Sequence, residues 1–298
     1  MKDIREFLKY VNICELNEKI NSFRELDFKK LDYKEIQDAI LNVISFDTPQ
    51  GKRSVLPTAT TSYIKGTRFF RVRHIDNNYT RLPLKSMSTV ADCWEAPSDF
   101  VKAGRLNRDN ESLLYTSPIY PAVAVEEMKI EEGKFFSLIV YEAIESINAT
   151  CIGFGPEING LSENEALKLK MLQYFLKHEF TRDVGKGTEF LYRISESIVK
   201  DYFDLPSEVQ DAWSYPSVAK KGGYNTCFRP STKRKLKLIG VQIASLTYGN
   251  DDYLFKVWKV AKDSGNGIDL TYYDIGSLEQ KSIFPEINII NTSHVIPE

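Results

Sequence analysis

Apolar residues recur at the three- and four-residue spacing of an amphipathic helix in two stretches of the first 60 residues. The residues are Ile4, Phe7, Leu8, Val11, Ile36, Ile40, Val43 and Ile44. The charged stretch between them, FRELDFKKLDYKE, predicts a helix break. Residues 46–61, FDTPQGKRSVLPTATT, are polar and contain two prolines and a glycine, which indicates a domain boundary. The pattern therefore predicts a helical N-terminal extension over residues 1–60 and a second domain over residues 61–298.

From residue 68 onward the pattern changes to dense β-branched and aromatic runs separated by two strongly helical stretches. Helices are predicted over 162–180, where Ser162 and Glu165 form a capping box, and over 188–203, where Thr188 is the N-cap. Strands are predicted over 68–73, 112–117, 134–146, 227–248, 253–261 and 268–275. Because strands and helices follow one another without βαβ alternation, the expected fold class is α+β.

Composition narrows the class of protein. The 298 residues are 42% hydrophobic and 27% charged, as in an ordinary globular protein, and the formal net charge is −2. That charge gives no general attraction to nucleic acid or to anionic membranes, and no run of about 18 apolar residues predicts a membrane span. The four cysteines are scattered without a CxxC pair, which argues against a zinc site and for reduced thiols in a cytoplasmic protein.

Glycine-rich and histidine signals do not form a recognised site. The segment CIGFGPEING lacks the GxGxxG spacing, and VGKGT lacks the Walker spacing. The three histidines are far apart in the sequence, so neither a metal pair nor a catalytic triad is indicated.

Four polar segments remain as candidates for a functional site. They are FFRVR, GRLN, LYTSPIYPAVAVEE and YPSVAKKGGYN. The residues of interest in them are Arg71, Arg105, Asn107, Tyr115, Glu126, Tyr215, Ser217 and Asn225. Together they supply two cations, one carboxylate, aromatic faces and small polar groups, which suits an anionic dinucleotide as ligand.

The order and character of these segments resemble the RES domain. That family shows a strand ending in aromatic-Arg, then GRWN, then a Leu-Tyr strand with a Glu eleven residues after the Tyr, and later a YPS segment before a Gly-Gly-X-Asn turn. Tyr115 and Glu126 have that spacing, and the resemblance covers about residues 68–245. Leu106 stands where the family usually has Trp, which removes a stacking surface.

The position of Glu126 supports the same interpretation. Ile119, Ala122, Val123 and Glu126 share one stripe of a helix that is predicted to start near residue 118, whereas Glu127 is turned about 100° away and is expected to face solvent. A carboxylate on an apolar stripe must be paired or functional. A rim position or an ion pair with an arginine such as Arg71 remains the structural alternative.

The other candidates also have structural alternatives. Arg71 would bind a phosphate with two parallel hydrogen bonds. Arg105 could equally have a structural role in the turn that contains it. Tyr115 would stack on a flat ring or belong to the core. Ser217 could cap a turn, and Asn225 is a typical turn residue.

The resemblance implies an ADP-ribosyltransferase-like split β core with flanking helices and an NAD+-degrading toxin that cleaves the nicotinamide–ribose bond by phosphorolysis or hydrolysis. It makes Glu126, Arg71 and Ser217 catalytic. The implied substrate-binding residues are Arg105, Asn107, Tyr115, Tyr215 and Asn225. NAD+ is the substrate, inorganic phosphate is a co-substrate of the phosphorolytic reaction, and no metal or other cofactor is expected.

The implied partner besides NAD+ is a cognate antitoxin protein, and self-association is left open. Two alternatives remain at this point: a protein ADP-ribosyltransferase that uses NAD+, and a non-catalytic interaction protein with a RES-like scaffold.

Overall fold

The computed structural model describes residues 2–75, 84–248 and 253–287. Its contacts divide the chain into two compact units, each built from three segments. Unit 1 comprises residues 1–61, 98–111 and 148–216, and unit 2 comprises residues 62–97, 112–147 and 217–298. The predicted boundary near residue 60 coincides with the end of the first segment of unit 1. Whether residues 61–298 form one domain remains a prediction.

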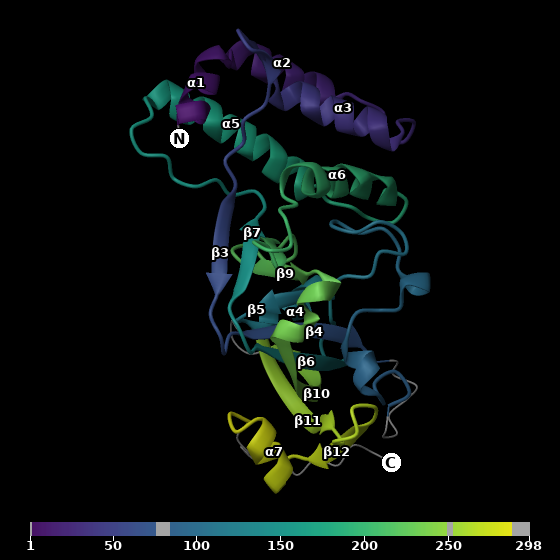
Figure 1. Cartoon of the computed structure of the whole chain (residues 1–298). Coiled ribbons are helices and arrows are strands. Elements are labelled where there is room, and N and C mark those ends of the chain that lie inside the picture. The colour runs from purple at the N-terminus through teal and green to yellow at the C-terminus, as the bar shows by residue number, and fades with distance from the viewer. Residues whose placement is uncertain (1, 76–83, 249–252, 288–298) are drawn as a thin grey trace. The chain divides into compact units, whose positions relative to one another are not determined.

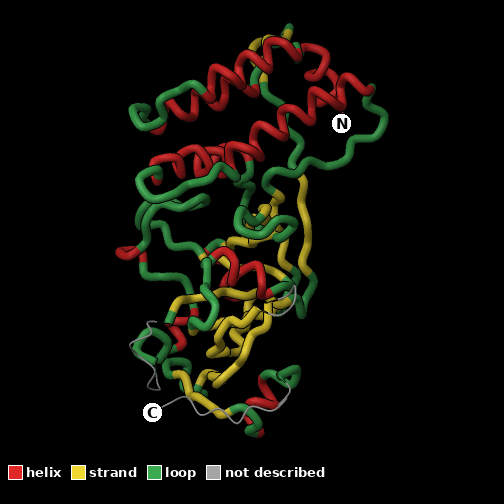
Figure 2. Tube along the Cα trace, turned by 180° about the vertical axis from the view of Figure 1, so that it is seen from behind, coloured by secondary structure: helices red, strands yellow, loops and turns green. Residues whose placement is uncertain are grey.

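Unit 1 is mainly helical. Helix α3 packs against α2 and α6, while α5 packs against α1 and α6 (Figures 1 and 2). The helices are α1 (Lys2–Tyr10), α2 (Ile13–Arg24), α3 (Tyr33–Ile44), α5 (Glu163–Phe180) and α6 (Tyr192–Tyr202). The predicted helix break between α2 and α3 is confirmed, and α3 begins with a capping box formed by Asp32 and Glu35. The first 61 residues thus bury their apolar stripes against helices that begin only at Glu163 and Tyr192.

The strands of unit 1 are short. The hairpin β1 (Phe46–Thr48) and β2 (Gly51–Arg53) lies within the segment that was predicted to be a linker. The strands β7 (Ile147–Cys151) and β8 (Ala212–Pro216) pair in parallel, and β3 (Ala59–Tyr63) is the next strand beside β7. Two 3-10 turns, Ser98–Phe100 and Glu189–Leu191, complete this unit.

Unit 2 is built on a seven-stranded part of the sheet with the order β12-β11-β10-β6-β4-β5-β9. The described neighbours in this part are antiparallel. The strands are β4 (Arg68–His74), β5 (Leu114–Pro118), β6 (Phe135–Ala143), β9 (Tyr224–Phe228), β10 (Leu236–Tyr248), β11 (Tyr253–Asp263) and β12 (Leu270–Asp274). The helices are α4 (Pro121–Glu127) and α7 (Leu278–Ile283), with 3-10 turns at Val90–Cys93 and Pro230–Lys235. The α+β class expected from the sequence is therefore confirmed.

The register assigns each side chain of β4 to one face of this sheet. Phe70 and Val72 share one face with Val125 of α4, and together they belong to an apolar core. Phe69 lies on the other face, where its ring packs edge-on against Phe228 at 4.9 Å. We call the face that α4 covers the helix-covered face.

Two of the predicted boundaries are wrong. Thr188 gives no side-chain cap to the first turn; a 3-10 turn follows it, and α6 starts at Tyr192. The strand expected over residues 227–248 is interrupted by the 3-10 turn Pro230–Lys235, because Pro230 has no backbone N–H to donate to a strand pair. The capping box at Ser162 and Glu165 is confirmed.

Within the described residues, no helix has the length and apolarity that a membrane crossing would need.

Candidate functional site

The strongest polar constellation of unit 2 lies where α4 covers strands β5 and β9. Tyr115 pairs with Cys227 and Thr116 with Thr226, so Ser117 is the next residue to face Asn225. The Ser117 hydroxyl donates to Asn225 Oδ1 at 2.8 Å. Ser117 is 1% exposed and Asn225 is 6% exposed, so this contact is protected from water. Strand pairing therefore holds the Asn225 amide in one orientation.

The same amide fixes a carboxylate of α4. Asn225 Nδ2 donates to Glu127 Oε1 at 2.6 Å, and the Ser217 hydroxyl donates to the same oxygen at 2.5 Å. The other oxygen, Oε2, has no hydrogen-bond partner among the described residues. Glu127 is half-buried. The result is an oriented carboxylate whose Oε1 accepts two hydrogen bonds and whose Oε2 accepts none from the described residues. We call Ser117, Glu127, Ser217 and Asn225 the Glu127 cluster.

Ser217 also organises the turn that leads into β9. Its hydroxyl accepts from Lys220 N at 2.9 Å, while its backbone N–H donates to Gly223 O at 2.9 Å. The turn-capping role that the sequence allowed for Ser217 is thus present together with its contact to the carboxylate. A β-carbon on Gly223 would lie 2.9 Å from Val123 Cγ2, so glycine lets the turn approach α4 closely.

Glu126 and Glu127 are both half-buried and both have partners. The expectation that Glu127 faces solvent is wrong, because Glu127 is half-buried and accepts two side-chain hydrogen bonds. Glu126 is also half-buried, with a side chain 27% exposed and an ion pair to Lys220 at 3.5 Å. The catalytic role predicted for Glu126 is not tested by these contacts.

The bounds and the burial of α4 explain why Glu127 is not exposed to solvent as expected. The helix starts at Pro121, and Ile119 precedes it with φ 66° and 56% exposure. The stripe through Ile119 therefore does not exist. Three consecutive residues of α4 are buried, Val123, Ala124 and Val125, so a single helical stripe does not describe its contact with the sheet.

Tyr115 lies on the same face as the Glu127 cluster. It is half-buried, two residues before Ser117 on β5, and alternation places both side chains on one side of the strand. The structure thus brings together three sequence-predicted residues, Tyr115, Ser217 and Asn225, with a carboxylate of α4.

Arg71 lies on the opposite face of the sheet. In β4, Phe70 faces Ser117 of β5, so its neighbour Arg71 projects to the other side. Arg71 and Arg73 both donate to the carbonyl oxygen of Trp94, Arg73 at 2.9 Å. Burial and then repulsion by Arg71 lower the pKa of Arg73. The alternative ion pair between Arg71 and Glu126 is not formed, and Arg71 does not reach the Glu127 cluster.

The remaining predicted residues belong to unit 1. Arg105 Nη1 donates to the carbonyl oxygens of Phe180 and Arg182, both at 2.9 Å, at the end of α5. Asn107 is buried and its Nδ2 donates to Lys102 O at 2.9 Å and to Arg108 O at 2.8 Å. These are contacts that shape a loop and a helix end, and ligand binding by either residue stays a prediction.

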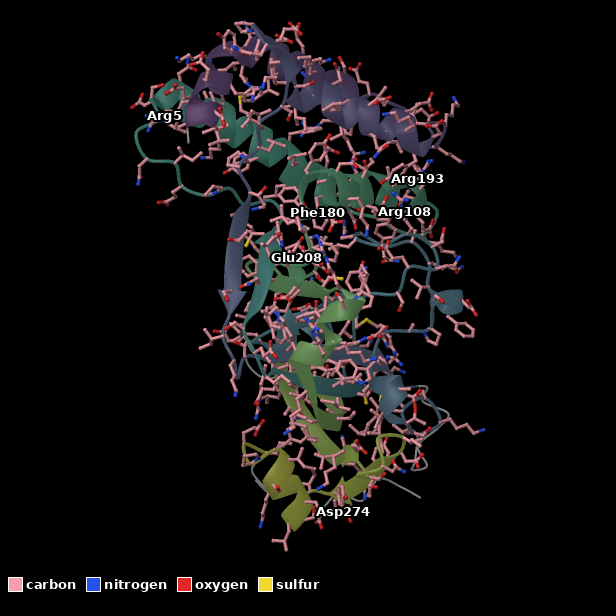
Figure 3. The ribbon with its side chains drawn as sticks, in the orientation of Figure 1. Arg5, Arg108, Phe180, Arg193, Glu208 and Asp274 are labelled. Carbon is pink, nitrogen blue, oxygen red and sulfur yellow. The ribbon has the colours of Figure 1, made fainter. Side chains whose placement is uncertain are left out.

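Two further residues of unit 1 contribute to its core. Tyr215 is 4% exposed and packs edge-on against Phe180 at 5.5 Å. Leu106, which replaces the usual Trp of the RES pattern, is fully buried. Phe180 lies at the end of α5, as Figure 3 shows.

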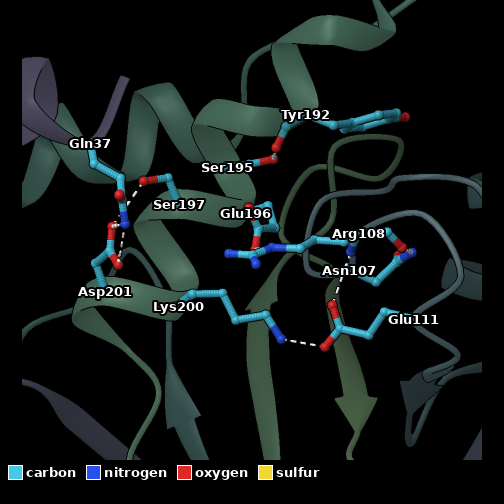
Figure 4. Close-up of polar contacts among 10 residues, drawn as sticks. All are labelled: Gln37, Asn107, Arg108, Glu111, Tyr192, Ser195, Glu196, Ser197, Lys200 and Asp201. Atoms are coloured by element: carbon cyan, nitrogen blue, oxygen red, sulfur yellow. Dashed lines mark hydrogen bonds and ion pairs between the residues drawn. The ribbon is translucent and has the colours of Figure 1, made fainter. Parts of the chain in front are cut away.

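Unit 1 also has a polar network that the sequence did not single out (Figure 4). Arg108 Nε contacts the buried carboxylate of Glu196 at 2.8 Å, and the guanidinium lies 4.6 Å from the centre of the Tyr33 ring. Burial, together with the hydrogen bond to Glu196, raises the pKa of Tyr33 to about 12. Lys200 pairs with Glu111 beside them. The network joins α3, α6 and the loop after residue 98, and no spacing in the sequence indicates it.

Comparison with known proteins gives no relative: no protein-family model matches the chain, and neither a curated protein nor a solved structure matches it. Among the described residues, no group of three or more His, Cys, Asp or Glu side chains is arranged to hold a metal ion. The arguments about function therefore rest on the geometry of the Glu127 cluster and on the RES-like sequence pattern.

Proposed function

We propose that the protein cleaves the nicotinamide–ribose bond of NAD+ and that Glu127 is the carboxylate that acts on the ribose. The observation that carries the proposal is the fixed Glu127 carboxylate, which receives hydrogen bonds from Ser217 at 2.5 Å and from Asn225 at 2.6 Å. The RES-like pattern also assigns both donors to the site, Ser217 as a catalytic residue and Asn225 as a substrate-binding residue. The contacts and the sequence pattern therefore support the same cluster.

The chemistry suits a fixed carboxylate. The nicotinamide nitrogen of NAD+ is positively charged and leaves as a neutral base, so that its departure requires no general acid. Positive charge then develops on the ribose, and a carboxylate already oriented toward it stabilises the transition state by about 3–4 kcal/mol, in the range of other preorganised groups. Glu127 Oε2 is the oxygen for this role, because Oε1 is engaged by Ser217 and Asn225.

Tyr115 completes the proposed pocket on the same sheet face. Its ring is half-buried on β5 and is the aromatic surface assigned to nicotinamide. Glu126 follows the RES spacing and lies beside Glu127 in α4, with Lys220 as its ion-pair partner. We assign Glu126 a supporting electrostatic role, and an ADP-ribosyltransferase-like arrangement of the core is part of the same proposal.

The phosphate role of Arg71 has weaker support, because Arg71 projects from the other face of the sheet. If Arg71 held the pyrophosphate or inorganic phosphate of this reaction, Arg71→Ala would lower kcat/KM.

The acceptor of the ADP-ribosyl group is phosphate in a phosphorylase and water in a glycohydrolase. A toxin restrained by a cognate antitoxin in the cytoplasm is the biological setting that the resemblance implies.

The test is direct incubation of the purified protein with NAD+, with and without inorganic phosphate and with and without EDTA, followed by chromatography of the products. The proposal expects nicotinamide under all four conditions if water is the acceptor, and only in the two conditions with phosphate if phosphate is the acceptor, with no effect of EDTA in either case. It expects ADP-ribose 1″-phosphate if phosphate is the acceptor, or ADP-ribose if water is. Intact NAD+ at high protein concentration under all four conditions would overturn the proposal. Loss of turnover only with EDTA would show that a metal takes part.

A further inference from the structure

A cavity of unit 2 lies over strands β4, β6, β10 and β11, on the helix-covered face. Its volume is about 800 Å³, within the range of small-molecule sites. Phe70, Leu138 and Val257 are among its apolar walls, and Pro121, the first residue of α4, stands at one side. None of the four residues of the Glu127 cluster lines this cavity. The cavity is therefore distinct from the site of the proposed function.

Gln242 is the polar group of the cavity floor. It lies on β10 directly opposite Leu138 of β6 and Val260 of β11, and it is only 8% exposed. Its side-chain amide lines the cavity and has no hydrogen-bond partner among the described residues. The amide atoms of Gln242 are not among the fully buried polar atoms without a partner, so the amide is accessible from the cavity. A ligand in the cavity can therefore form hydrogen bonds with both ends of the amide.

The charged side chains at the cavity have partners within the protein. Arg68 Nη1 contacts Glu286 Oε1 at 2.5 Å, and both residues line the cavity. The ammonium group of Lys256 lies 4.3 Å from the centre of the Trp258 ring. The amide itself offers one acceptor oxygen and two N–H donors. These groups favour a neutral ligand that presents one donor and one acceptor side by side.

We propose that this cavity binds a neutral, flat molecule that carries a carboxamide or a ring-amide edge, with that edge paired to Gln242. The ring of the ligand packs against the apolar walls. The hydrogen bonds between its amide and Gln242 make the site selective for ligands that carry an amide. An analogue that lacks the amide leaves Gln242 unpaired and binds more weakly for that reason. The proposal does not depend on cleavage of NAD+.

Benzamide is the probe for this site, with benzoate and toluene as matched analogues, and isothermal titration calorimetry is the measurement. Saturable binding of benzamide is expected, and benzoate and toluene should bind at least about tenfold more weakly. Gln242→Leu keeps the volume and removes the amide, so benzamide affinity should fall at least about tenfold. Gln50→Leu, at an exposed glutamine in the β1–β2 turn, is the matched control and should bind like the wild type.

The melting temperature separates loss of a ligand contact from loss of the fold. Gln242→Leu should melt at the wild-type temperature or above it, because an amide without a partner among the described residues is replaced by an apolar group. Val257→Trp is a second variant, which fills the cavity and leaves Gln242 in place; it should also abolish binding. No saturable binding of benzamide to the wild type, or equal binding to Gln242→Leu, would overturn the proposal. A markedly lower melting temperature for Gln242→Leu would show that the amide is structural and would overturn it too.

Discussion

The Glu127 carboxylate shows how the environment of one residue depends on contacts that are remote in sequence. Its two donors, Ser217 and Asn225, are 90 and 98 residues away along the chain. The sequence predicted both donors as site residues, on the basis of their local motifs. The choice between Glu126 and Glu127 could not be made from helical spacing, because α4 is only seven residues long and buries three consecutive side chains.

The cysteines differ in a way that chemical labelling can measure. Cys14 is exposed, whereas Cys93 and Cys227 are buried. Burial, with a smaller contribution from Asp92, raises the pKa of the Cys93 thiol to about 12, so that it stays protonated at neutral pH. Thiolate is the reactive form, and we therefore expect Ellman's reagent at about pH 8 to modify Cys14 rapidly and the buried thiols slowly.

Cys14→Ser should remove the fast phase, and denaturant should expose all remaining thiols. A fast phase of equal size in Cys14→Ser would show that the burial of the other cysteines is wrong.

At the scale of elements, α4 and the turn before β9 hold the cluster together. Gly223→Ala would place a β-carbon 2.9 Å from Val123 Cγ2 and 3.1 Å from the Lys220 carbonyl oxygen. Because Val123 is β-branched and stiff, α4 must shift, and Glu127 must move away from Ser217 and Asn225. We expect a loss of about 1–3 kcal/mol in the free energy of unfolding and a disproportionate loss of NAD+ turnover.

Val123→Ala in the same chain should restore part of the turnover lost in Gly223→Ala, since it removes the methyl groups that clash. The control is Gly185→Ala in unit 1, where a β-carbon would meet no atom within 4 Å. Turnover in Gly223→Ala equal to that of the wild type would show that the contact between the turn and α4 does not position the carboxylate.

Elements that are specified by short sequence motifs were predictable from the sequence. Elements that depend on pairing with distant strands were not. The capping box at Ser162 is complete within four residues, and the sequence located it correctly. Residues 227–248 have strand-like composition throughout, yet the chain turns at Pro230 before β10 pairs with β6. The face on which Arg71 lies follows from the pairing of β4 with β5, which no spacing in the sequence reveals.

At the scale of the whole molecule, the chain passes several times between two units. The polar composition near residue 60 predicted a boundary between an N-terminal extension and a single further domain. It gave no sign that residues 98–111 and 148–216 belong with the N-terminal helices. These segments are joined by helix contacts such as α3 with α6 and α1 with α5, which connect parts of the chain that lie far apart in the sequence.

Alkaline pH is expected to destabilise the folded chain. Burial is the largest cause of the raised pKa values of Cys93, Tyr33 and Tyr202, each about 12 against ordinary values of 9.0 for cysteine and 10.0 for tyrosine. Above these ordinary values the unfolded chain loses protons that the folded chain keeps, so the free energy of unfolding falls as pH rises.

Thermal melting between about pH 8 and about pH 11 should therefore show a decline that steepens above about pH 9. Tyr202→Phe, compared with the wild type, should make the decline shallower. A melting temperature that is constant over this range would contradict the burial of these groups.

If Glu127 stabilises positive charge on the ribose of NAD+, the glutamine variants of Glu127 and of its neighbour Glu126 should differ sharply in turnover. Glu127→Gln retains an oxygen to accept from Ser217 and Asn225 but removes the charge, so kcat should fall at least about a hundredfold, roughly 2.7 kcal/mol. The affinity for NAD+ and the melting temperature should change little, because the charge is needed in the transition state. Glu126→Gln should lose much less activity. A Glu127→Gln protein that folds and turns over NAD+ at the wild-type rate, while Glu126→Gln does not, would contradict the account.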